Sequence, residues 1–283
     1  MIESIGASTR LLALLGNPVA HSLSPHIQNA AIRASGHDAV YLALRCDADD
    51  VAGLLRGVAR SGGGGNVTVP HKEEAARVVD HPAEAVRLTG ACNTFWWENG
   101  RIRGDNTDVE GFRGAVEELL GETAAGRRVL LLGAGGAARA ALVGLLRDGV
   151  EEVVVWNRTL AKAEDLARKL GGGRARAVAS IDEVAEVPFE LVINSTSLGL
   201  READPLPVEP EALREPGAVL DLVYRPQETQ LVLRAREVGA AAADGGEMLV
   251  RQGAEAFRRW WGLAPPMDVM RRALQEVRSE ASA

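Results

Sequence analysis

The first third of the chain alternates short apolar runs with segments in which apolar residues recur every three or four positions. Apolar runs bounded by turn residues are typical of buried strands, and the longer spacing is typical of helices that cover them. This pattern predicts strands at 11–15, 41–45 and 66–69, with helices at 25–35 and 49–60. The four glycines at 62–65 predict a flexible turn before the third strand.

A hairpin and a helix lead into a second alternating region. Asn99-Gly100 separates the segments CNTFWW at 92–97 and RIRG at 101–104, and Asn-Gly is a strong turn signal between strands. A helix is predicted over 108–120. The elements predicted after it are strands at 128–132, 152–156, 175–179, 190–194, 218–223 and 240–243, and helices at 136–147, 160–170, 227–238, 246–261 and 267–278.

This alternation sets the fold class as α/β. Near-continuous Val, Leu and Ile strands separated by helices indicate a parallel sheet that is covered on both faces. A chain of 283 residues is long for a single core, and about 150 residues per domain suggests two. We expect a first domain over 1–108, completed by the C-terminal helices at 246–283, and a second over 109–245.

Composition narrows the class of protein. Hydrophobic residues make up 46% and charged residues 25%, as in ordinary globular proteins. We expect no signal peptide, because the N-terminus has no basic run followed by an apolar stretch. We expect no membrane association, because no apolar run approaches the ~20 residues of a membrane span. Cys46, Cys92 and the five histidines show no metal or redox spacing, which predicts no metal site and a reducing, cytoplasmic location. The net charge of -7 argues against a nucleic-acid partner.

A glycine-rich loop, GAGGAA at 133–138, follows the strand 128–132. Its context, a buried strand before and an alanine-rich helix after, is that of a dinucleotide-binding unit. Gly133 permits the tight turn, Gly135 lets the backbone approach a pyrophosphate, and Ala138 lets helix and strand pack closely. The alternative is a glycine-rich turn without a ligand. The residues assigned to the cofactor here are Gly133, Ala134, Gly135, Gly136 and Ala137.

The next strand ends in Trp156-Asn157-Arg158-Thr159, where an NAD site usually has an acidic residue. Arg158 can stack on adenine and pair with a 2′-phosphate, and Asn157 and Thr159 can donate to its oxygens. Lys162 can add a second charge. The alternative is a solvated surface in which Thr159 is a helix N-cap. The arginine favours NADP(H) as the cofactor.

The first domain carries four polar motifs, each following a predicted strand: GNPVAHSLSPH at 16–26, NVTVPHK at 66–72, GACNT at 90–94 and GDNTD at 104–108. Each has a purely structural alternative. Ser24 before Pro25 is an ordinary N-cap, Lys72 can open a helix, and Asp108 can cap one. Their shared position after strands is where ligands bind in open α/β sheets.

Together these motifs resemble those of the shikimate dehydrogenase family. GNPxxHSxSP, NVTxPxK, GAxNT and GDNTD are followed, in the family's order, by GAGGAxRA, NRT, NSTSxG, DLVYxPxxT and GxxMLxxQ, from about Leu14 to Trp261. The resemblance implies a substrate-binding domain and a Rossmann-type NADP-binding domain with an active-site cleft between them. It also implies reversible, NADPH-dependent reduction of 3-dehydroshikimate to shikimate, on the route to chorismate and the aromatic amino acids.

The resemblance further implies roles for single residues. Lys72 and Asp108 match the family's catalytic pair. The residues that match its substrate site are Ser22 and Ser24 for the carboxylate, Asn66, Thr68, Asn93 and Gln252 for the ring hydroxyls, and Tyr224 in the pocket. The remaining cofactor assignments are Thr196, Leu222, Gly245 and Met248. The departures from the pattern are Gln28-Asn29 for the frequent His-Asn, NSTS at 194–197 for NATS, and Leu222 for methionine.

The chemistry of the pair is consistent with this activity. A lysine ammonium can protonate the alkoxide that forms on hydride transfer, while Asp108 orients both the lysine and the hydroxyl; either group can be the general acid. A quinate- or NAD-using relative and a silent NADP-binding sensor remain alternatives. Ser22, Ser24 and Arg158 favour shikimate with NADP, and intact Lys72 and Asp108 disfavour a sensor. The expected partner is a small molecule, bound to a monomer or homodimer.

Overall fold

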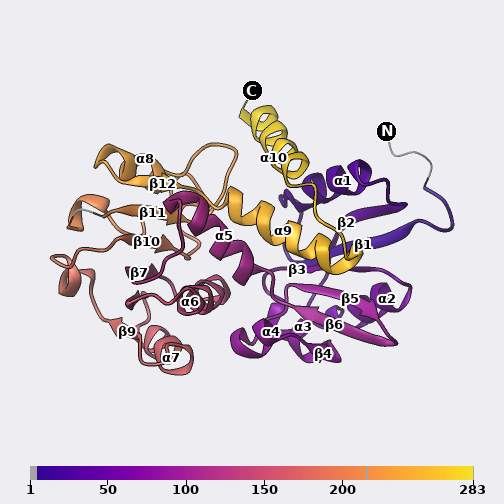
Figure 1. Ribbon diagram of the computed structural model, residues 1–283, viewed down its shortest axis with the longest axis horizontal. Coiled ribbons are helices and arrows are strands. Elements are labelled where there is room, and N and C mark those ends of the chain that lie inside the picture. The colour runs from indigo at the N-terminus through magenta and orange to yellow at the C-terminus, as the bar shows by residue number, and fades with distance from the viewer. Residues whose placement is uncertain (1–4, 215, 283) are drawn as a thin grey trace. The chain divides into compact units, whose positions relative to one another are not determined.

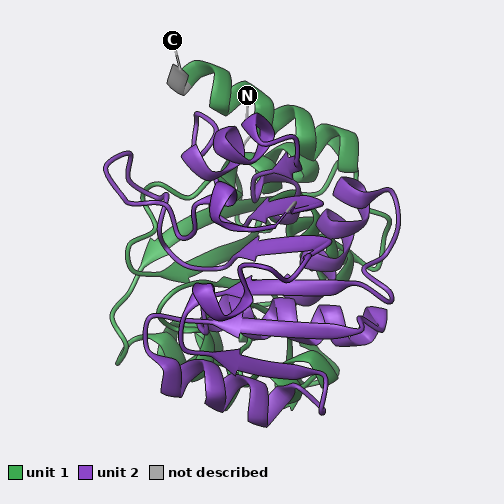
Figure 2. Cartoon of the chain, turned by 90° about the vertical axis from the view of Figure 1, so that its left-hand side faces the viewer, with its two compact units in different colours: residues 1–107, 249–281, 283 green, residues 108–248, 282 purple. Residues whose placement is uncertain are grey.

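The computed structural model describes residues 5–214 and 216–282, and for 281–282 only the backbone. The chain divides into two compact units (Figures 1 and 2). Unit 1 comprises residues 5–107 and Leu249–Ala281, and unit 2 comprises Asp108–Met248. Each unit contains a six-stranded sheet. Within the described ranges, no helix has both the length and the apolar character needed to cross a membrane.

The sheet of unit 1 is mixed, with the strand order β2-β1-β3-β5-β6-β4. Its strands are β1 (Arg10–Gly16), β2 (Ala39–Arg45), β3 (Gly64–Val67), β4 (His81–Pro82), β5 (Thr94–Glu98) and β6 (Arg101–Asp105). β1 is parallel to β2 and β3, whereas β5 is antiparallel to β3 and β6. The predicted hairpin is confirmed, because Asn99 and Gly100 turn the chain with φ angles of 50° and 75°.

Helices cover both faces of this sheet. They are α1 (Ser24–Ala34), α2 (Val51–Arg60), α3 (Lys72–Val78), α4 (Glu84–Thr89), α9 (Gly246–Trp261) and α10 (Met267–Ser282). Successive side chains of β1 point to opposite faces: Leu12 and Leu14 pack with α1 and α9, and Ala13 and Leu15 pack with α2 and α3. The sequence pattern did not predict α4, and it suggested α3 only through the alternative in which Lys72 opens a helix, because six and seven residues are too few to establish a helical period.

The prediction of a flexible turn at 62–65 is wrong in its second half. Gly64 and Gly65 open β3, which lies between β1 and β5. A Cβ at Gly65 would overlap the carbonyl of Ala13, and one at Gly64 would lie 2.7 Å from the carbonyl oxygen of Phe95. These glycines therefore serve close backbone packing inside the sheet rather than flexibility.

The sheet of unit 2 has the order β12-β11-β10-β7-β8-β9, and each described strand pair is parallel. Its strands are β7 (Arg128–Leu132), β8 (Glu152–Trp156), β9 (Ala175–Val178), β10 (Leu191–Asn194), β11 (Ala218–Asp221) and β12 (Ala241–Ala243). Counted within the unit, this is the doubly wound order of dinucleotide-binding folds. The order reverses between β7 and β10, and ligands bind such sheets at that point.

Helices cover this second sheet on both faces as well, which confirms the prediction made from its apolar strands. The elements are α5 (Asp108–Leu120), α6 (Gly136–Asp148), α7 (Leu160–Leu170) and α8 (Gln230–Glu237), with short 3₁₀ turns η1 (Ile181–Val184) and η2 (Pro210–Ala212). Phe112, Leu142 and Leu166 bring α5, α6 and α7 onto one face. Leu231 and Val184 bring α8 and η1 onto the other.

Candidate active site

The glycine loop of unit 2 begins with a turn that only glycine can make. Gly133 has a φ of 109°, and its N–H donates to the carbonyl of Trp156 at 2.8 Å. A Cβ at this position would lie 2.6 Å from the Oγ of Ser195. The role predicted for Gly133 as the residue of the tight turn is therefore confirmed.

Beyond this turn the loop is open. Gly135 is the N-cap residue of α6 and Gly136 its first residue; both are exposed, and no described atom lies within 4 Å of a Cβ built on either. Ala134 and Ala137 are half-buried, whereas Ala138 is fully buried in the core, as predicted for close packing of the helix. The first amides of α6 have no side-chain cap. Such amides can donate hydrogen bonds to a phosphate bound at the switch point.

The end of β8 presents unpaired positive charge. The Asn157 side-chain amide donates to the carbonyl of Thr159 at 2.9 Å and so closes the turn into α7. Thr159 occupies the N-cap position, but its side chain makes no capping hydrogen bond, so its hydroxyl is not committed to the helix. Arg158 and Lys162 are exposed, and within the described part of the chain neither forms an ion pair.

A buried polar network joins the ends of β10 and β11. Asn194 donates to the Oδ1 atom of Asp221 at 2.8 Å, and the Thr229 hydroxyl donates to Oδ2 at 2.7 Å. All three residues are completely buried. Burial raises the pKa of the Asp221 carboxyl to about 6, although the hydrogen bonds lower it in part. We call Asn194, Asp221 and Thr229 the carboxylate network.

Thr196 and Ser195 are held by the loop after β10. The Thr196 hydroxyl donates to the Oδ1 atom of Asn194 at 2.7 Å and accepts from the Leu198 N–H at 3.1 Å. The Ser195 hydroxyl donates to the carbonyl of Leu132 at 2.6 Å. The serine that replaces the commoner alanine of the motif therefore ties this loop to the end of β7, beside the glycine turn.

The other cofactor assignments of unit 2 gather around Val223. The Leu222 N–H donates to the Asn194 carbonyl at 2.8 Å, and the Gly245 N–H donates to the Val223 carbonyl at 3.1 Å. A Cβ at Gly245 would overlap the carbonyl of Leu222, so this position requires glycine. Met248 packs in the same core as Leu222, and Tyr224 is half-buried.

In unit 1, the two serines lie at the start of α1. The structural alternative of Ser24 as N-cap is wrong: α1 begins at Ser24, and the N-cap residue is Leu23. Instead, the Ser22 hydroxyl oxygen accepts from the Ser24 N–H at 3.3 Å. Sequence reasoning placed the cap one residue too late, because Leu23 already has helical φ and ψ angles. Both serines are half-buried at a helix N-terminus, where the dipole favours an anion.

Asn66 and Asn93 are brought together in a second buried network. The Tyr41 hydroxyl donates to Oδ1 of Asn66 at 2.8 Å, and Nδ2 of Asn66 donates to the Asn93 carbonyl and to the Thr94 hydroxyl, at 3.1 and 2.9 Å. Oδ1 of Asn93 accepts from the Thr107 N–H at 2.8 Å. We call these five residues the amide network. Because both Nδ2 hydrogens of Asn66 are used internally, a ligand can meet only its oxygen.

The two catalytic candidates are Lys72 and Asp108, and each lies next to a part of the amide network. Lys72 is the first residue of α3, half-buried, and its carbonyl accepts from the N–H of Cys92, next to Asn93. Asp108 is buried and follows Thr107 directly, as the first residue of α5. Lys72 belongs to unit 1 and Asp108 begins unit 2. Thr68, half-buried, precedes Lys72 by four residues.

Gln252 lies on α9, where the tail is fixed to unit 1. Its side chain is half-buried and donates to a carbonyl one turn earlier. Gln28, which replaces the frequent histidine, is buried and donates to the Gly253 carbonyl at 2.9 Å. Arg259 pairs with Asp105 at 2.9 Å. These contacts connect α9 to α1 and to the residues just before Thr107.

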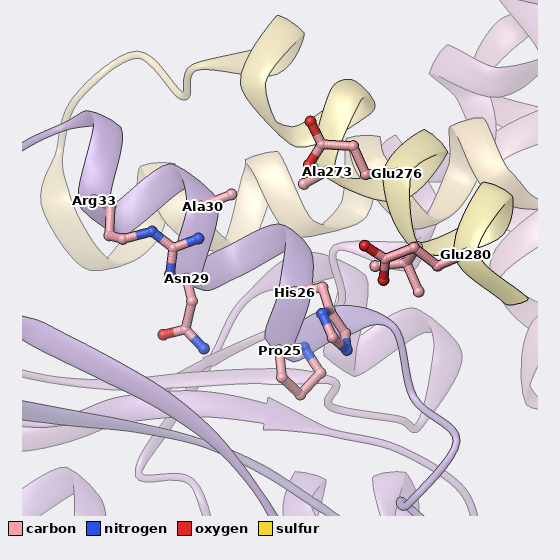
Figure 3. A pocket seen from close by; sticks show the side chains of 9 residues that line it. Pro25, His26, Asn29, Ala30, Arg33, Ala273, Glu276 and Glu280 are labelled. Carbon is pink, nitrogen blue, oxygen red and sulfur yellow. The ribbon is translucent and has the colours of Figure 1, made fainter. Parts of the chain in front are cut away.

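A pocket of about 290 Å³ lies elsewhere in unit 1, between α1 and α10 (Figure 3). Its ionisable side chains are His26 and Arg33 of α1 and Glu276 and Glu280 of α10. None of the assigned site residues lines it. In the described ranges, no cluster of three or more His, Cys, Asp or Glu side chains could hold a metal ion.

Comparison with known proteins identifies the family. Three family models match the chain: the shikimate dehydrogenase substrate binding domain at 14–95, shikimate / quinate 5-dehydrogenase at 115–200, and the shikimate 5'-dehydrogenase C-terminal domain at 245–275. A protein of Rubrobacter xylanophilus named shikimate dehydrogenase (NADP(+)) is 44% identical, over 96% of this chain and 98% of its own. The chain belongs to the shikimate dehydrogenase family.

Solved structures of shikimate dehydrogenases share this architecture. That of Aquifex aeolicus has a TM-score of 0.89 at 38% identity, covering 96% of this chain and all of its own. That of Thermus thermophilus, in complex with NADP(H) and shikimate, has a TM-score of 0.85 at 39% identity, covering 94% and 98%. The predicted α/β fold, with the substrate-binding and Rossmann-type domains of the shikimate dehydrogenase family, is thus confirmed.

Proposed function

We propose that this chain is an NADP-dependent shikimate dehydrogenase, an oxidoreductase that reversibly reduces 3-dehydroshikimate to shikimate with hydride from NADPH. The observation that carries the choice of cofactor is the unpaired Arg158 at the end of β8, beside an open glycine turn. An arginine there pairs with a 2′-phosphate, where an acidic residue would select NAD. The 44% identity to an NADP-dependent relative supports the substrate.

In this proposal unit 2 binds the cofactor. The pyrophosphate meets the amides of the loop Gly133, Ala134, Gly135, Gly136 and Ala137. Arg158 and Lys162 neutralise the 2′-phosphate, with Asn157 and Thr159 as further donors. The nicotinamide lies against Thr196, Leu222, Gly245 and Met248.

Unit 1 supplies most of the substrate site. Ser22 and Ser24 bind the carboxylate at the N-terminus of α1, where the helix dipole also favours an anion. The ring hydroxyls meet the oxygen of Asn66 and the side chains of Thr68, Asn93 and Gln252. Tyr224 is the remaining residue assigned to substrate in this proposal. The substrate class is therefore a hydroxylated ring acid, recognised by hydroxyl and amide groups.

Lys72 and Asp108 carry out the proton chemistry in this proposal. Hydride from the nicotinamide adds to the carbonyl carbon, and the carbonyl oxygen must then gain one proton. The Lys72 ammonium donates that proton, and the Asp108 carboxylate orients the lysine and the forming hydroxyl. The reverse reaction removes the hydroxyl proton and returns hydride to NADP⁺.

The biological setting follows from the reaction. The enzyme acts on small molecules, as a monomer or homodimer and without a nucleic-acid partner, and it belongs to the biosynthesis of chorismate and the aromatic amino acids. Cys46 and Cys92 are both free and buried, as in proteins of reducing compartments. We therefore assign the enzyme to the cytoplasm as part of the same proposal.

An absorbance assay of NADP⁺ reduction tests the proposal. Purified protein is mixed with shikimate or quinate and with NADP⁺ or NAD⁺, with a reaction that lacks the acid as control. We expect the highest kcat/KM with shikimate and NADP⁺. A higher value with quinate or NAD⁺ would assign the other specificity. Tight NADPH binding without turnover of either acid would instead make the chain a binding protein.

A further inference from the structure

The carboxylate network is hydrogen-bonded to the loops that carry the residues proposed to face the nicotinamide. None of its own members is assigned to the site. Asp221 ends β11 and pairs in register with Asn194 at the end of β10. Its side chain is completely buried and accepts three hydrogen bonds, from Asn194, from the Val223 N–H at 3.1 Å, and from Thr229. A buried carboxylate in an apolar strand is uncommon unless its partners require it.

One side of the network holds the loop after β10. Asn194 uses both of its amide hydrogens, one on Asp221 and one on the Leu198 carbonyl at 3.1 Å. Its oxygen accepts from the N–H and the hydroxyl of Thr196, at 3.0 and 2.7 Å. The orientation of the Asn194 amide is therefore set by Asp221, and the amide in turn sets the conformation of the loop through Leu198.

The other side holds the chain after β11. The same Oδ1 atom that accepts from Asn194 also accepts from the N–H of Val223, the residue between Leu222 and Tyr224. The Val223 carbonyl accepts from Gly245 at 3.1 Å. Thr229 donates to Oδ2 and accepts from the Val232 N–H at 3.4 Å, which caps α8. One carboxylate thus fixes both segments and the helix that follows.

We propose that Asp221 is a positioning residue for the cofactor: by joining Asn194, the Val223 backbone and Thr229, it holds the two loops that form the nicotinamide subsite. This inference rests on the proposed function, since it takes Thr196, Leu222 and Gly245 as cofactor contacts. Asp221 itself touches neither substrate nor cofactor in this role. A carboxylate can accept from all three converging donors at once.

The test compares variants of Asp221 by NADPH fluorescence, steady-state kinetics and thermal unfolding. In Asp221→Ala we expect the Kd for NADPH to rise about tenfold or more, as for the loss of hydrogen bonds to a charged group. The KM for shikimate should change much less. Asp221→Asn is isosteric and keeps the acceptor for Asn194 and Val223, so it should restore most of the affinity.

Leu145→Ala is the matched control, because Leu145 is buried on α6 in the core of the same unit, far along the helix from the glycine loop. It should lower the unfolding midpoint while leaving the Kd for NADPH within about twofold. Should Asp221→Ala fail to fold, Thr229→Val removes one donor to Asp221 together with the side-chain cap of α8, and a severalfold rise in Kd is expected.

Three results would overturn the inference: an unchanged Kd in Asp221→Ala, an equal loss in Leu145→Ala, or, where the alanine variant does not fold, an unchanged Kd in Thr229→Val. Failure of the proposed function looks different. In that case the wild-type chain itself does not bind NADPH or does not oxidise shikimate, whatever the variants do.

Discussion

In each unit a buried polar network joins the ends of neighbouring strands, and the two networks differ in the chemical groups at their centres. The amide network of unit 1 contains only amides and hydroxyls, and its centre is Asn66 and Asn93. The carboxylate network of unit 2 has an ionisable group, Asp221, at its centre. Both networks are buried, so both must pair their polar atoms. Only the second contains a group that titrates between about pH 4 and 8.

The central group of each network matches the donors and acceptors that surround it. In unit 1, Asn66 faces both a donor, the Tyr41 hydroxyl, and acceptors, so an amide matches its surroundings. In unit 2, three donors converge on Asp221 and a carboxylate is the side chain that accepts from all of them. A network of amides and hydroxyls keeps its hydrogen bonds from about pH 4 to 8. A carboxylate network forms stronger hydrogen bonds but bears the free-energy cost of a buried charge.

The largest effect should come from the chemistry assigned to unit 1. Lys72→Ala should lower kcat by ~10²–10⁴, the contribution of a general acid, while the Kd for NADPH stays nearly constant. Arg77→Ala, on an exposed position of the same helix, is the control. Stopped-flow and steady-state assays measure both quantities. A variant with near wild-type kcat would remove Lys72 from the mechanism.

The pH dependence of stability should separate the two networks next. The folded-state pKa of Asp221 is raised from 3.8 to about 6, so the folded protein binds its proton more tightly than the unfolded chain does. The stabilising effect of this proton is complete below about pH 4 and is lost as the pH rises through about 6, at a cost of roughly 3 kcal/mol. Relative to wild type, Asp221→Asn should therefore gain stability between these values.

Urea unfolding of both proteins across this pH range measures the difference directly. The charge of Asp244 raises the pKa of Asp221 further. Asp244→Asn should therefore reduce the loss of stability that wild type shows as the pH rises from about 4 to 6. A difference between wild type and Asp221→Asn that is constant with pH would mean that the carboxyl does not titrate in this range.

Disruption of the amide network should cost less and show no such pH dependence. Asn93→Ala leaves the Thr107 N–H without its acceptor, at an expected cost of about 1–3 kcal/mol in unfolding free energy. The loss should be the same from about pH 4 to 8, because no member titrates there. The KM for shikimate should rise as well. If the loss of unfolding free energy in Asn93→Ala changed with pH, the amide network would also contain a group that titrates in this range.

Arg158→Ala should have a smaller effect, confined to the cofactor. The Kd for NADPH should rise about tenfold more than that for NADH, as for one solvent-exposed contact to phosphate. Arg168→Ala, an exposed arginine on α7, should leave both unchanged. Equal losses for the two cofactors would limit Arg158 to stacking on adenine.

The smallest effect should come from His37, which stacks on Trp261 at 3.8 Å between ring centroids. Burial, and then the charge of Arg10, lowers the pKa of this histidine. A lowered pKa means that the unfolded chain takes up the proton first, so this histidine destabilises the fold as the pH falls below about 6.5. His37→Phe keeps the stacking, and its unfolding midpoint should be less sensitive to acid than that of wild type.

The sequence by itself determined the parts of this protein that depend on neighbours along the chain. The apolar strands of unit 2 were predicted nearly residue for residue, because a fully buried strand must be apolar at every position. Gly133 and Asn99-Gly100 were predicted as turns, because their φ angles are a property of the residue itself. The polar motifs after the strands of unit 1 likewise pointed to the family.

Only the tertiary structure decided what depends on residues far apart in the chain. Gly64 and Gly65 look like a flexible turn until Ala13 and Phe95 are seen on either side of them. Asp221 looks like one more polar residue at a strand end until the folded chain shows that it is buried, which raises its pKa, and that three donors converge on it. Close packing and desolvation come from elements brought together by folding, so no local pattern of residues encodes them.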